Sequence, residues 1–247
     1  MTISESIRIV RVCSSLTPDE QQLPTSTHSD QSAVVARCNR WRNAFRNADV
    51  CYPATLLSLP LAAKWLREER CEVDARSPQG MSFAMSAGVA PKRVFFHCAG
   101  ATGRTIHEVI GLGVGQFVVD SERAAAMLGA CADRPERVLV DVTSGAPDSL
   151  FKALLAEERL LMTGLYSELG YPEATVPRML EHCAELRRRH GMLLTRIGIV
   201  ARGGHALPVE SAAEAISDAV SEGCARLRLH PPSLTVFPDW MALTHDM

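Results

Sequence analysis

Eight short apolar segments recur along the chain, and stretches with helical periodicity lie between them. The apolar segments span residues 49–54, 71–77, 93–99, 116–121, 137–143, 161–169, 196–201 and 233–237. The intervening helical patterns span residues 57–69, 80–87, 105–112, 122–131, 149–158, 174–190 and 211–228. Strands that alternate with helices pair in parallel, and eight such steps favour a closed (β/α)8 barrel of the TIM type over an open sheet.

The length of the chain agrees with one barrel domain. Its 247 residues and 26.9 kDa lie within the range of a single (β/α) barrel. Residues 1–32 include a polar stretch rich in Ser, Thr, Pro, Asp and Gln, so we expect a loose N-terminal segment there. An amphipathic helix over residues 33–45 then opens a single domain that runs from 33 to 247. Because only ten residues follow the last apolar segment, we expect the final barrel helix to be missing.

Composition excludes several classes of protein. A net charge of −2, with 47% hydrophobic and 22% charged residues, speaks against a disordered chain and against a strongly cationic nucleic-acid binder. No apolar run approaches the ~20 residues that span a bilayer, and the N-terminus lacks a signal pattern, so we expect a cytoplasmic protein without a membrane segment. The eight cysteines are scattered without any CxxC, which predicts buried, reduced thiols and no structural metal site.

A barrel of this type carries its chemistry at the carboxyl ends of its strands. Those positions here are Thr55, Ser77, His97, Cys98, Asp120, Ser121, Asp141, Thr143, Tyr166, Glu168, Arg202 to His205, and Phe237 to Trp240. The run Arg202-Gly203-Gly204 could bind an anion through backbone N–H groups, although an ordinary tight turn with an exposed arginine explains it equally simply.

Three further patterns have both a functional and a plainer interpretation. His97 beside Cys98 could act as base and nucleophile, although the sequence identifies no third group that would orient the base. The plainer interpretation is that both side chains pack in the core at the end of a strand. Glu168 could be a general acid or base, or simply a solvated charge. The cluster Arg187 to Arg189 ends a helical stretch, where cations complement the helix dipole.

Several motifs, taken in order, resemble one family. They are Ala36-Arg37-Cys38 to Phe45, Val50-Cys51-Tyr52-Pro53-Ala54-Thr55, Val73-Asp74-Ala75-Arg76-Ser77, Ala87 to Arg93 with Phe96-His97, and Val118-Val119-Asp120-Ser121. The chain resembles the barrel domain of the fold-type III pyridoxal phosphate (PLP) decarboxylases, and most closely the diaminopimelate decarboxylases. The resemblance extends over residues 33–243 and is close up to Leu128. It implies a PLP-binding barrel like that of alanine racemase.

The resemblance also identifies the position on which the cofactor depends. In the family the first strand ends in the lysine that forms a Schiff base with PLP, and in this chain that position is Thr55. A hydroxyl cannot form an imine. The chain has three lysines, Lys64, Lys92 and Lys152, and their places in the pattern put them in helical stretches or before a strand, away from the cofactor.

Other family positions differ as well. The sixth-strand motif Gly-Leu-His-x-His-Ile-Gly, whose second His stacks on the pyridine ring, becomes Gly164-Leu165-Tyr166-Ser167-Glu168-Leu169-Gly170. The phosphate-binding Gly-Gly-Gly-Phe-Gly becomes Arg202 to Ala206, and Glu-Pro-Gly-Arg becomes Phe237 to Trp240. The chain stops where the family's C-terminal β-domain would begin, so we expect that domain to be missing.

These departures lead to three hypotheses. The first is a catalytically retired barrel that binds a small phosphorylated ligand or a partner protein such as a paralogous decarboxylase. The second is noncovalent binding of PLP or another phosphate ligand by Arg202, Gly203, Gly204, Ser77 and His97, in a protein similar in size to the single-domain PLP-homeostasis barrels. The third is an enzyme with altered chemistry that uses His97, Cys98, Asp141, Glu168 and His205. An uncovered last strand would favour association between copies.

Overall fold

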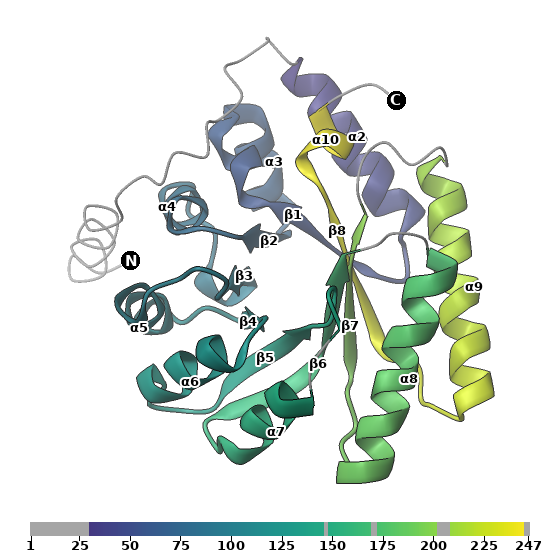
Figure 1. Ribbon diagram of the computed structural model, residues 1–247. Helices are drawn as coiled ribbons and strands as arrows, with labels where there is room; N and C mark the ends of the chain where they lie inside the picture. Colours follow the sequence, from purple (N-terminus) through teal and green to yellow (C-terminus); the bar gives the residue numbers. More distant parts are fainter. Residues whose placement is uncertain (1–29, 146–147, 169–171, 202–207, 245–247) are drawn as a thin grey trace.

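The computed structural model describes residues 30–145, 148–168, 172–201 and 208–244, and its centre is a closed parallel barrel (Figure 1). Its strands follow chain order, and β8 closes on β1. They are β1 Asp49–Pro53, β2 Glu72–Ala75, β3 Val94–His97, β4 Gln116–Val119, β5 Glu136–Asp141, β6 Leu160–Glu168, β7 Arg196–Ala201 and β8 Ser233–Pro238. The structure thus confirms the (β/α)8 prediction.

Helices surround this barrel and cover the outer faces of the strands (Figure 1). The α-helices are α2 Gln31–Ala44, α3 Pro60–Glu68, α4 Pro78–Ser86, α5 Gly103–Leu112, α6 Glu122–Cys131, α7 Asp148–Ala156, α8 Pro172–His190, α9 Val209–Leu227 and α10 Trp240–Thr244. Two short 3-10 helices, η1 Ala54–Ser58 and η2 Pro91–Arg93, join them. Helix α2 begins two residues before the position expected from the sequence, because Asp30 caps it by accepting a hydrogen bond from the Ser32 amide.

The two ends of the described chain meet over the last strand. Helix α2 packs against β1, α3 and α9, and the short helix α10 after β8 packs against α2. The Arg37 guanidinium donates to the Leu243 carbonyl across this contact. The described residues therefore place α10 and α2 together beside the junction of β8 and β1.

Small hydroxyl residues start the helices that follow three consecutive strands. Ser77, Thr102 and Ser121 cap α4, α5 and α6, and each side-chain oxygen accepts from the backbone N–H three residues later at 3.2 Å. Such caps satisfy amides that a helix cannot pair internally. Because strand ends and helix starts are locked together in this way, the residues around the barrel mouth are held on rigid elements.

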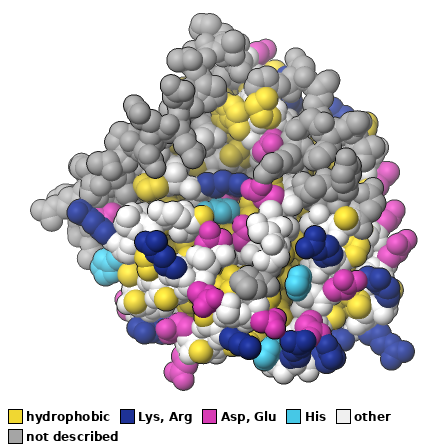
Figure 2. Space-filling view, in the orientation of Figure 1, with side chains coloured by type: hydrophobic (Ala, Val, Ile, Leu, Met, Phe, Trp, Pro, Cys, Tyr) yellow, Lys and Arg dark blue, Asp and Glu magenta, His cyan; other side chains and the backbone are white. Residues whose placement is uncertain are grey.

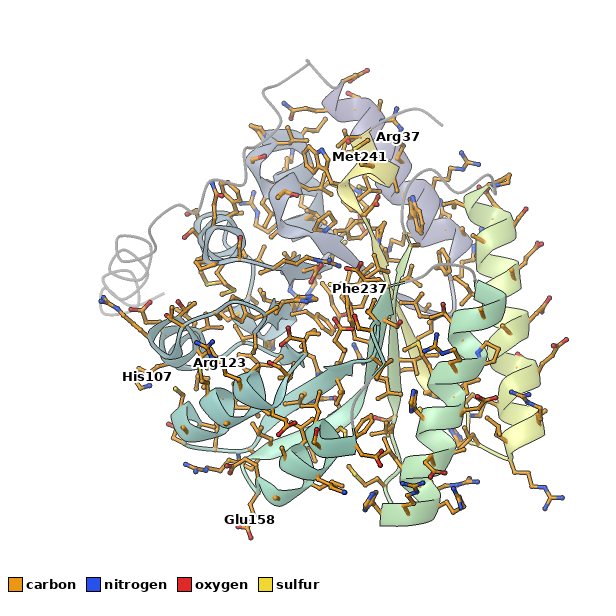
Figure 3. All side chains as sticks on the ribbon, viewed as in Figure 1. Arg37, His107, Arg123, Glu158, Phe237 and Met241 are labelled. Carbon is orange, nitrogen blue, oxygen red and sulfur yellow. The ribbon has the colours of Figure 1, made fainter. Side chains whose placement is uncertain are left out.

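Apolar and aromatic side chains fill the inside of the barrel. One inner cluster consists of Cys51, Phe95, Val118, Leu139, Tyr166, Val200 and Phe237. The Phe237 ring meets Phe95 edge to face at 5.3 Å between ring centroids and Tyr166 at 5.2 Å. Figure 3 shows Phe237 near the barrel centre, whereas His107, Arg123 and Glu158 project from the periphery. The interior of the barrel is therefore a packed core and not an open channel.

Below this aromatic layer, at the amino-terminal ends of the strands, lies a partly buried charge cluster. Arg196 donates to the Thr235 hydroxyl at 3.1 Å, and its guanidinium nitrogens lie 3.5 Å from Asp49 and 3.6 Å from Glu72. Among the described side chains, Glu72 Oε2 is buried without a hydrogen-bond partner. Burial raises the pKa of Glu72 above its ordinary value, although Arg196 opposes the shift.

Replacing Glu72 by glutamine is expected to raise the free energy of unfolding at neutral pH by up to about 1 kcal/mol, because the variant no longer buries a charge without a hydrogen bond. A raised folded-state pKa means that the wild type loses stability as pH rises from the unfolded carboxyl pKa through the folded one. The stability advantage of Glu72→Gln over the wild type should therefore disappear in acid, where the wild-type carboxyl is protonated. Urea titrations at acid and neutral pH measure it, with Asp49→Asn at the exposed partner as control. A loss at neutral pH would show that the contact with Arg196 outweighs the burial.

The described residues also bear on the cysteine and membrane predictions. Seven cysteines are free thiols and most of them are buried; Cys13 lies outside the described residues. Within the described ranges, no three or more His, Cys, Asp or Glu side chains gather in a way that could hold a metal ion. Among the helices described, none has the length and apolarity to cross a bilayer.

Candidate functional site at the barrel mouth

Five polar side chains from three strands form one connected group at the carboxyl end of the barrel. We call Asp74, Arg76, His97, Tyr166 and Glu168 the mouth cluster. Side chains alternate between the two faces of a strand, so Asp74 and Arg76 share the inner side at the end of β2, as Tyr166 and Glu168 do on β6. His97 comes from the end of β3, which pairs with β2. On the face drawn in Figure 2, basic, histidine and acidic side chains gather near the centre.

Asp74 is the most deeply buried member of the mouth cluster, with a side chain only 4% exposed. Its Oδ1 lies 2.7 Å from His97 Nε2, and its Oδ2 accepts from Arg76 Nε at 2.7 Å. Burial alone would raise the pKa of Asp74, but the contacts with His97 and Arg76 outweigh it and hold the pKa below its ordinary value. Asp74 is therefore an ionised carboxylate that orients the imidazole on one side and the guanidinium on the other.

Arg76 links the carboxyl ends of β2 and β6. Besides its bond to Asp74, it donates to Glu168 Oε1 at 3.0 Å and to the Tyr166 hydroxyl at 2.5 Å. Burial would lower the pKa of Arg76, but Asp74, Tyr166 and Glu168 together raise it above its ordinary value. The guanidinium is fully charged and uses three of its five N–H donors in these bonds.

An aromatic layer supports the cluster from below. The His97 ring lies edge to face against Tyr166 at 5.0 Å between ring centroids, and the Arg76 guanidinium carbon is 5.9 Å from the Tyr166 ring centre. Burial raises the pKa of Tyr166 well above its ordinary value, so its hydroxyl stays protonated. The rings fix the positions of both His97 and the Tyr166 hydroxyl.

The position that the family resemblance assigns to the Schiff-base lysine lies outside the mouth cluster. Thr55 is exposed within η1, and its carbonyl accepts from the Ser58 hydroxyl at 2.7 Å. The three lysines of the chain all lie in described residues, and none is buried: Lys64 is on α3, Lys92 in η2 before β3, and Lys152 on α7. None of these elements is a carboxyl end of a strand, so no lysine side chain joins the cluster.

The structure places the other predicted site residues in different surroundings. His97 and Glu168 are both in the mouth cluster, whereas the Ser77 hydroxyl caps α4. His97 is buried and Glu168 is partly exposed, and both have bonding partners at the end of another strand. Arg202, Gly203 and Gly204 lie outside the described residues, as does His205.

Cys98, the proposed nucleophile of the third hypothesis, packs in the core between the strands and the helices. Burial raises the pKa of its thiol to about 12, and an activated cysteine needs the opposite shift. Burial therefore disfavours the thiolate that Cys98 would need to act as a nucleophile with His97 as its base.

Asp74 and Arg76 were not among the candidates from the sequence. The available signal was their spacing of two at the end of β2, which places both on the inner side together with Glu72. That spacing identifies a shared face but not the partners on β6, because residues 76 and 168 are 92 positions apart.

Comparison with known proteins now identifies the family. Residues 31–155, just over half of the chain, match the sequence model described as "Pyridoxal-dependent decarboxylase, pyridoxal binding domain". The chain belongs to this decarboxylase family. The match includes Asp74, Arg76 and His97 and ends before β6.

Relatives in this decarboxylase family are longer than the matched region. Diaminopimelate decarboxylase of Actinosynnema pretiosum subsp. auranticum is 32% identical over 125 residues, which are 51% of this chain and 29% of the relative. That of Mycobacterium tuberculosis (strain ATCC 25618 / H37Rv) is 24% identical over 170 residues, 57% of this chain and 38% of the relative. The chain thus matches well under half the length of these relatives.

Solved structures share the barrel. Diaminopimelate decarboxylase from Helicobacter pylori, complexed with L-lysine, has a TM-score of 0.70 at 14% identity, covering 87% of this chain and 63% of the other. Ornithine decarboxylase from Entamoeba histolytica has a TM-score of 0.72 at 17% identity, covering 84% and 62%. At these identities the likeness establishes the fold.

The decarboxylase family binds PLP, but the described mouth does not fit covalent attachment of that cofactor. Attachment needs a lysine amine at the mouth, and the cation there is the guanidinium of Arg76, which does not form imines at neutral pH. The guanidinium also lies in bonds to groups on both β2 and β6. The misfit concerns attachment through lysine only.

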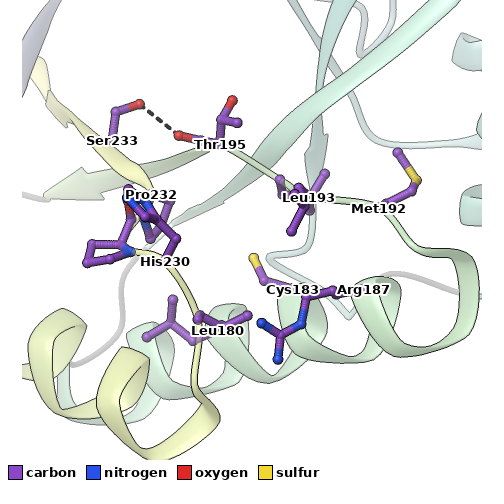
Figure 4. Close-up of a pocket in the computed structure, with 12 residues that line it drawn as sticks. Leu180, Cys183, Arg187, Met192, Leu193, Thr195, His230, Pro232 and Ser233 are labelled. Atoms are coloured by element: carbon purple, nitrogen blue, oxygen red, sulfur yellow. Dashed lines mark hydrogen bonds between the residues drawn. The ribbon is translucent and has the colours of Figure 1, made fainter.

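A cavity lies at the opposite end of the barrel and is separate from the mouth cluster. It has a volume of about 370 Å³ and opens between α8 and the segments that lead into β7 and β8 (Figure 4). Leu180, Cys183, Leu193 and Pro232 are among its apolar walls, and Arg187 enters from α8. The Arg187 guanidinium donates to the Arg228 and Leu227 carbonyls at the end of α9, so it caps the carboxyl end of that helix.

Proposed function

We propose that this member of the decarboxylase family is catalytically retired and acts by noncovalent binding at the barrel mouth. The observation that carries the proposal is the position of the amines, because all three lysines lie on outer elements. The family resemblance supports it, since Thr55 stands where the attachment lysine is expected. Without an amine in reach, a PLP-dependent reaction that begins with a Schiff base has no starting point.

The replacement of both sixth-strand histidines supports the same proposal. Tyr166 and Glu168 stand where the family resemblance places those histidines, and both bind Arg76. The Arg76 side chain, held by Tyr166 and Glu168, would compete with a stacked pyridine ring for the space above the Tyr166–Phe237 layer. We therefore propose a mouth suited to reversible ligand binding rather than to covalent cofactor chemistry.

Incubation with PLP followed by borohydride reduction tests this proposal. We expect no lysine to be modified stoichiometrically, because none lies at the mouth. The matched control is the lysine-free variant Lys64→Arg/Lys92→Arg/Lys152→Arg. Its affinity for PLP, measured by calorimetry, should equal that of the wild type. Intact mass and peptide mapping read out the adduct. A stoichiometric adduct on one wild-type lysine, or release of CO2 from an amino acid, would contradict retirement.

The bound species is proposed as a small phosphorylated ligand or a partner protein, such as a related decarboxylase. Calorimetry with PLP and inorganic phosphate tests the first. Co-purification with a related decarboxylase tests the second, and association between copies of this chain would be measured in the same experiment. Binding of PLP that persists in the lysine-free variant would identify noncovalent recognition.

One observation favours a second candidate function, an enzyme with different chemistry. Asp74 and His97 form a buried carboxylate–imidazole pair at 2.7 Å, an arrangement in which the carboxylate orients the ring and selects its tautomer. Such a histidine can accept a proton from a ligand. If the barrel turns over any substrate, His97→Gln should remove that activity while the protein remains folded.

A further inference from the structure

The mouth cluster has the donor–acceptor pattern of a receptor for a guanidinium group. Three oxygens from two strands accept from one guanidinium: Asp74 Oδ2, Glu168 Oε1 and the Tyr166 hydroxyl. Two of these oxygens are carboxylates, and the Tyr166 ring lies beside the cation at 5.9 Å. Carboxylates and an aromatic ring are the groups that recognise planar cations in proteins. The occupant in the structure is the chain's own Arg76.

The receptor oxygens have supports that do not depend on Arg76. His97 holds Oδ1 of Asp74, and the Phe237 ring packs against Tyr166. The Glu168 backbone N–H donates to the Thr143 hydroxyl at 2.9 Å, which links the end of β6 to the segment after β5. If Arg76 moves out, these contacts keep the Asp74 carboxylate and the Tyr166 ring in place and hold the backbone from which the Glu168 side chain projects.

Arg76 is placed so that it can leave. It follows the last residue of β2, and its side chain is 44% exposed, whereas the Asp74 side chain beneath it is 4% exposed. Of its partners, Glu168 is the most exposed, with a side chain 22% exposed, whereas Tyr166 is buried. Rotation of one long side chain toward solvent would uncover the receptor without any change in the barrel.

We propose that the mouth is a guanidinium-binding site that Arg76 fills from within, so that an external ligand bearing a guanidinium group enters only by displacing this side chain. The inference rests on the proposed binding function of the mouth and adds the chemical class of the ligand group and an internal competitor. A tethered competitor has an effective concentration of about millimolar or more, so it weakens external binding without altering the receptor.

Removal of the competitor tests the proposal. In Arg76→Ala, methylguanidinium chloride at about 10 mM is expected to raise the thermal midpoint, because a ligand that binds only the folded state stabilises it. Sodium chloride at equal ionic strength and N-methylurea, which has a similar shape without charge, should give no rise. The wild type should bind methylguanidinium on the order of ten-fold more weakly than Arg76→Ala, or worse.

Two matched variants show where methylguanidinium binds. Arg123→Ala removes an exposed arginine of α6 at the periphery and should leave the response at the wild-type level. Adding Glu168→Gln to Arg76→Ala removes one receptor carboxylate and should weaken binding on the order of ten-fold. Equal responses of wild type and Arg76→Ala, or no effect of Glu168→Gln, would overturn the proposal.

Loss of folding in Arg76→Ala would also be informative. In that case methylguanidinium should restore a cooperative melt, since it returns the missing cation to Asp74 and Glu168. Failure to restore folding, together with no binding by the milder variant Arg76→Gln, would overturn the proposal. Retirement would still stand, because that proposal fails only through a PLP–lysine adduct or decarboxylation.

Discussion

Replacing Asp74 by asparagine is expected to lower the free energy of unfolding by about 3 kcal/mol, a large part of the stability of a typical domain. The Asp74 carboxylate is 4% exposed and accepts from both His97 and Arg76 at 2.7 Å. Asparagine has one acceptor oxygen and no charge, so the buried position loses its charge and one of these two charge-assisted hydrogen bonds. Chemical denaturation at neutral pH measures the loss.

Asp120→Asn provides the control for this change, because Asp120 is an exposed aspartate at the end of β4 whose Oδ1 accepts from Ser121. Its effect should remain within about 0.5 kcal/mol.

The contribution of Asp74 to stability should depend on pH with a defined sign. Since the folded-state pKa of Asp74 is lowered, its contribution is complete above the unfolded pKa and is lost as pH falls through the folded one. Equal losses in the two variants, or a difference that grows in acid, would contradict this account.

A single methyl group on β6 should be nearly as damaging. Gly164 pairs with Arg196 of β7, and a Cβ at residue 164 would lie 1.9 Å from the Arg196 carbonyl oxygen and 3.0 Å from Leu139 Cδ2. The obstructing atom is backbone in a neighbouring strand of a closed barrel, so it cannot rotate away. We expect Gly164→Ala to lower the free energy of unfolding by about 3 kcal/mol or more.

Gly111→Ala is the matched control for the glycine prediction. Gly111 lies within α5, and among the described residues no heavy atom outside the helix's own backbone comes within 4 Å of the place that a methyl group would take. Alanine in an exposed helix interior should stabilise the protein by about 0.5–1 kcal/mol. Thermal melts of both variants test the pair. If Gly164→Ala leaves the melting temperature unchanged or raises it as Gly111→Ala does, β6 and β7 are not as closely spaced as described.

The periodicity of the chain was sufficient to predict the barrel. Eight apolar runs at similar spacing admit few parallel arrangements, and each strand was predicted within a few residues of its observed bounds. The end of the domain was less predictable. The packing of α10 on α2 joins residues about 200 positions apart, and no local pattern in either segment identifies the other.

The site was only partly predictable from the sequence. His97 and Glu168 were identified as strand-end residues, but their functions depend on partners from other strands. The spacing of Asp74 and Arg76 indicates that both lie on the inner face of one strand. It does not indicate that Arg76 contacts β6, because that contact depends on the register between strands. Sequence spacing specifies faces along a strand, whereas contacts across the barrel follow from strand tilt and closure.

The bonds of Arg76 also join two sides of the mouth that are far apart in the chain. Tyr166 and Glu168 on β6 each bind the guanidinium of the residue that follows β2, 90 and 92 positions away. Strands β2 and β6 are otherwise connected through the strands that lie between them in the closed sheet. One side chain thus forms a direct brace across the barrel rim.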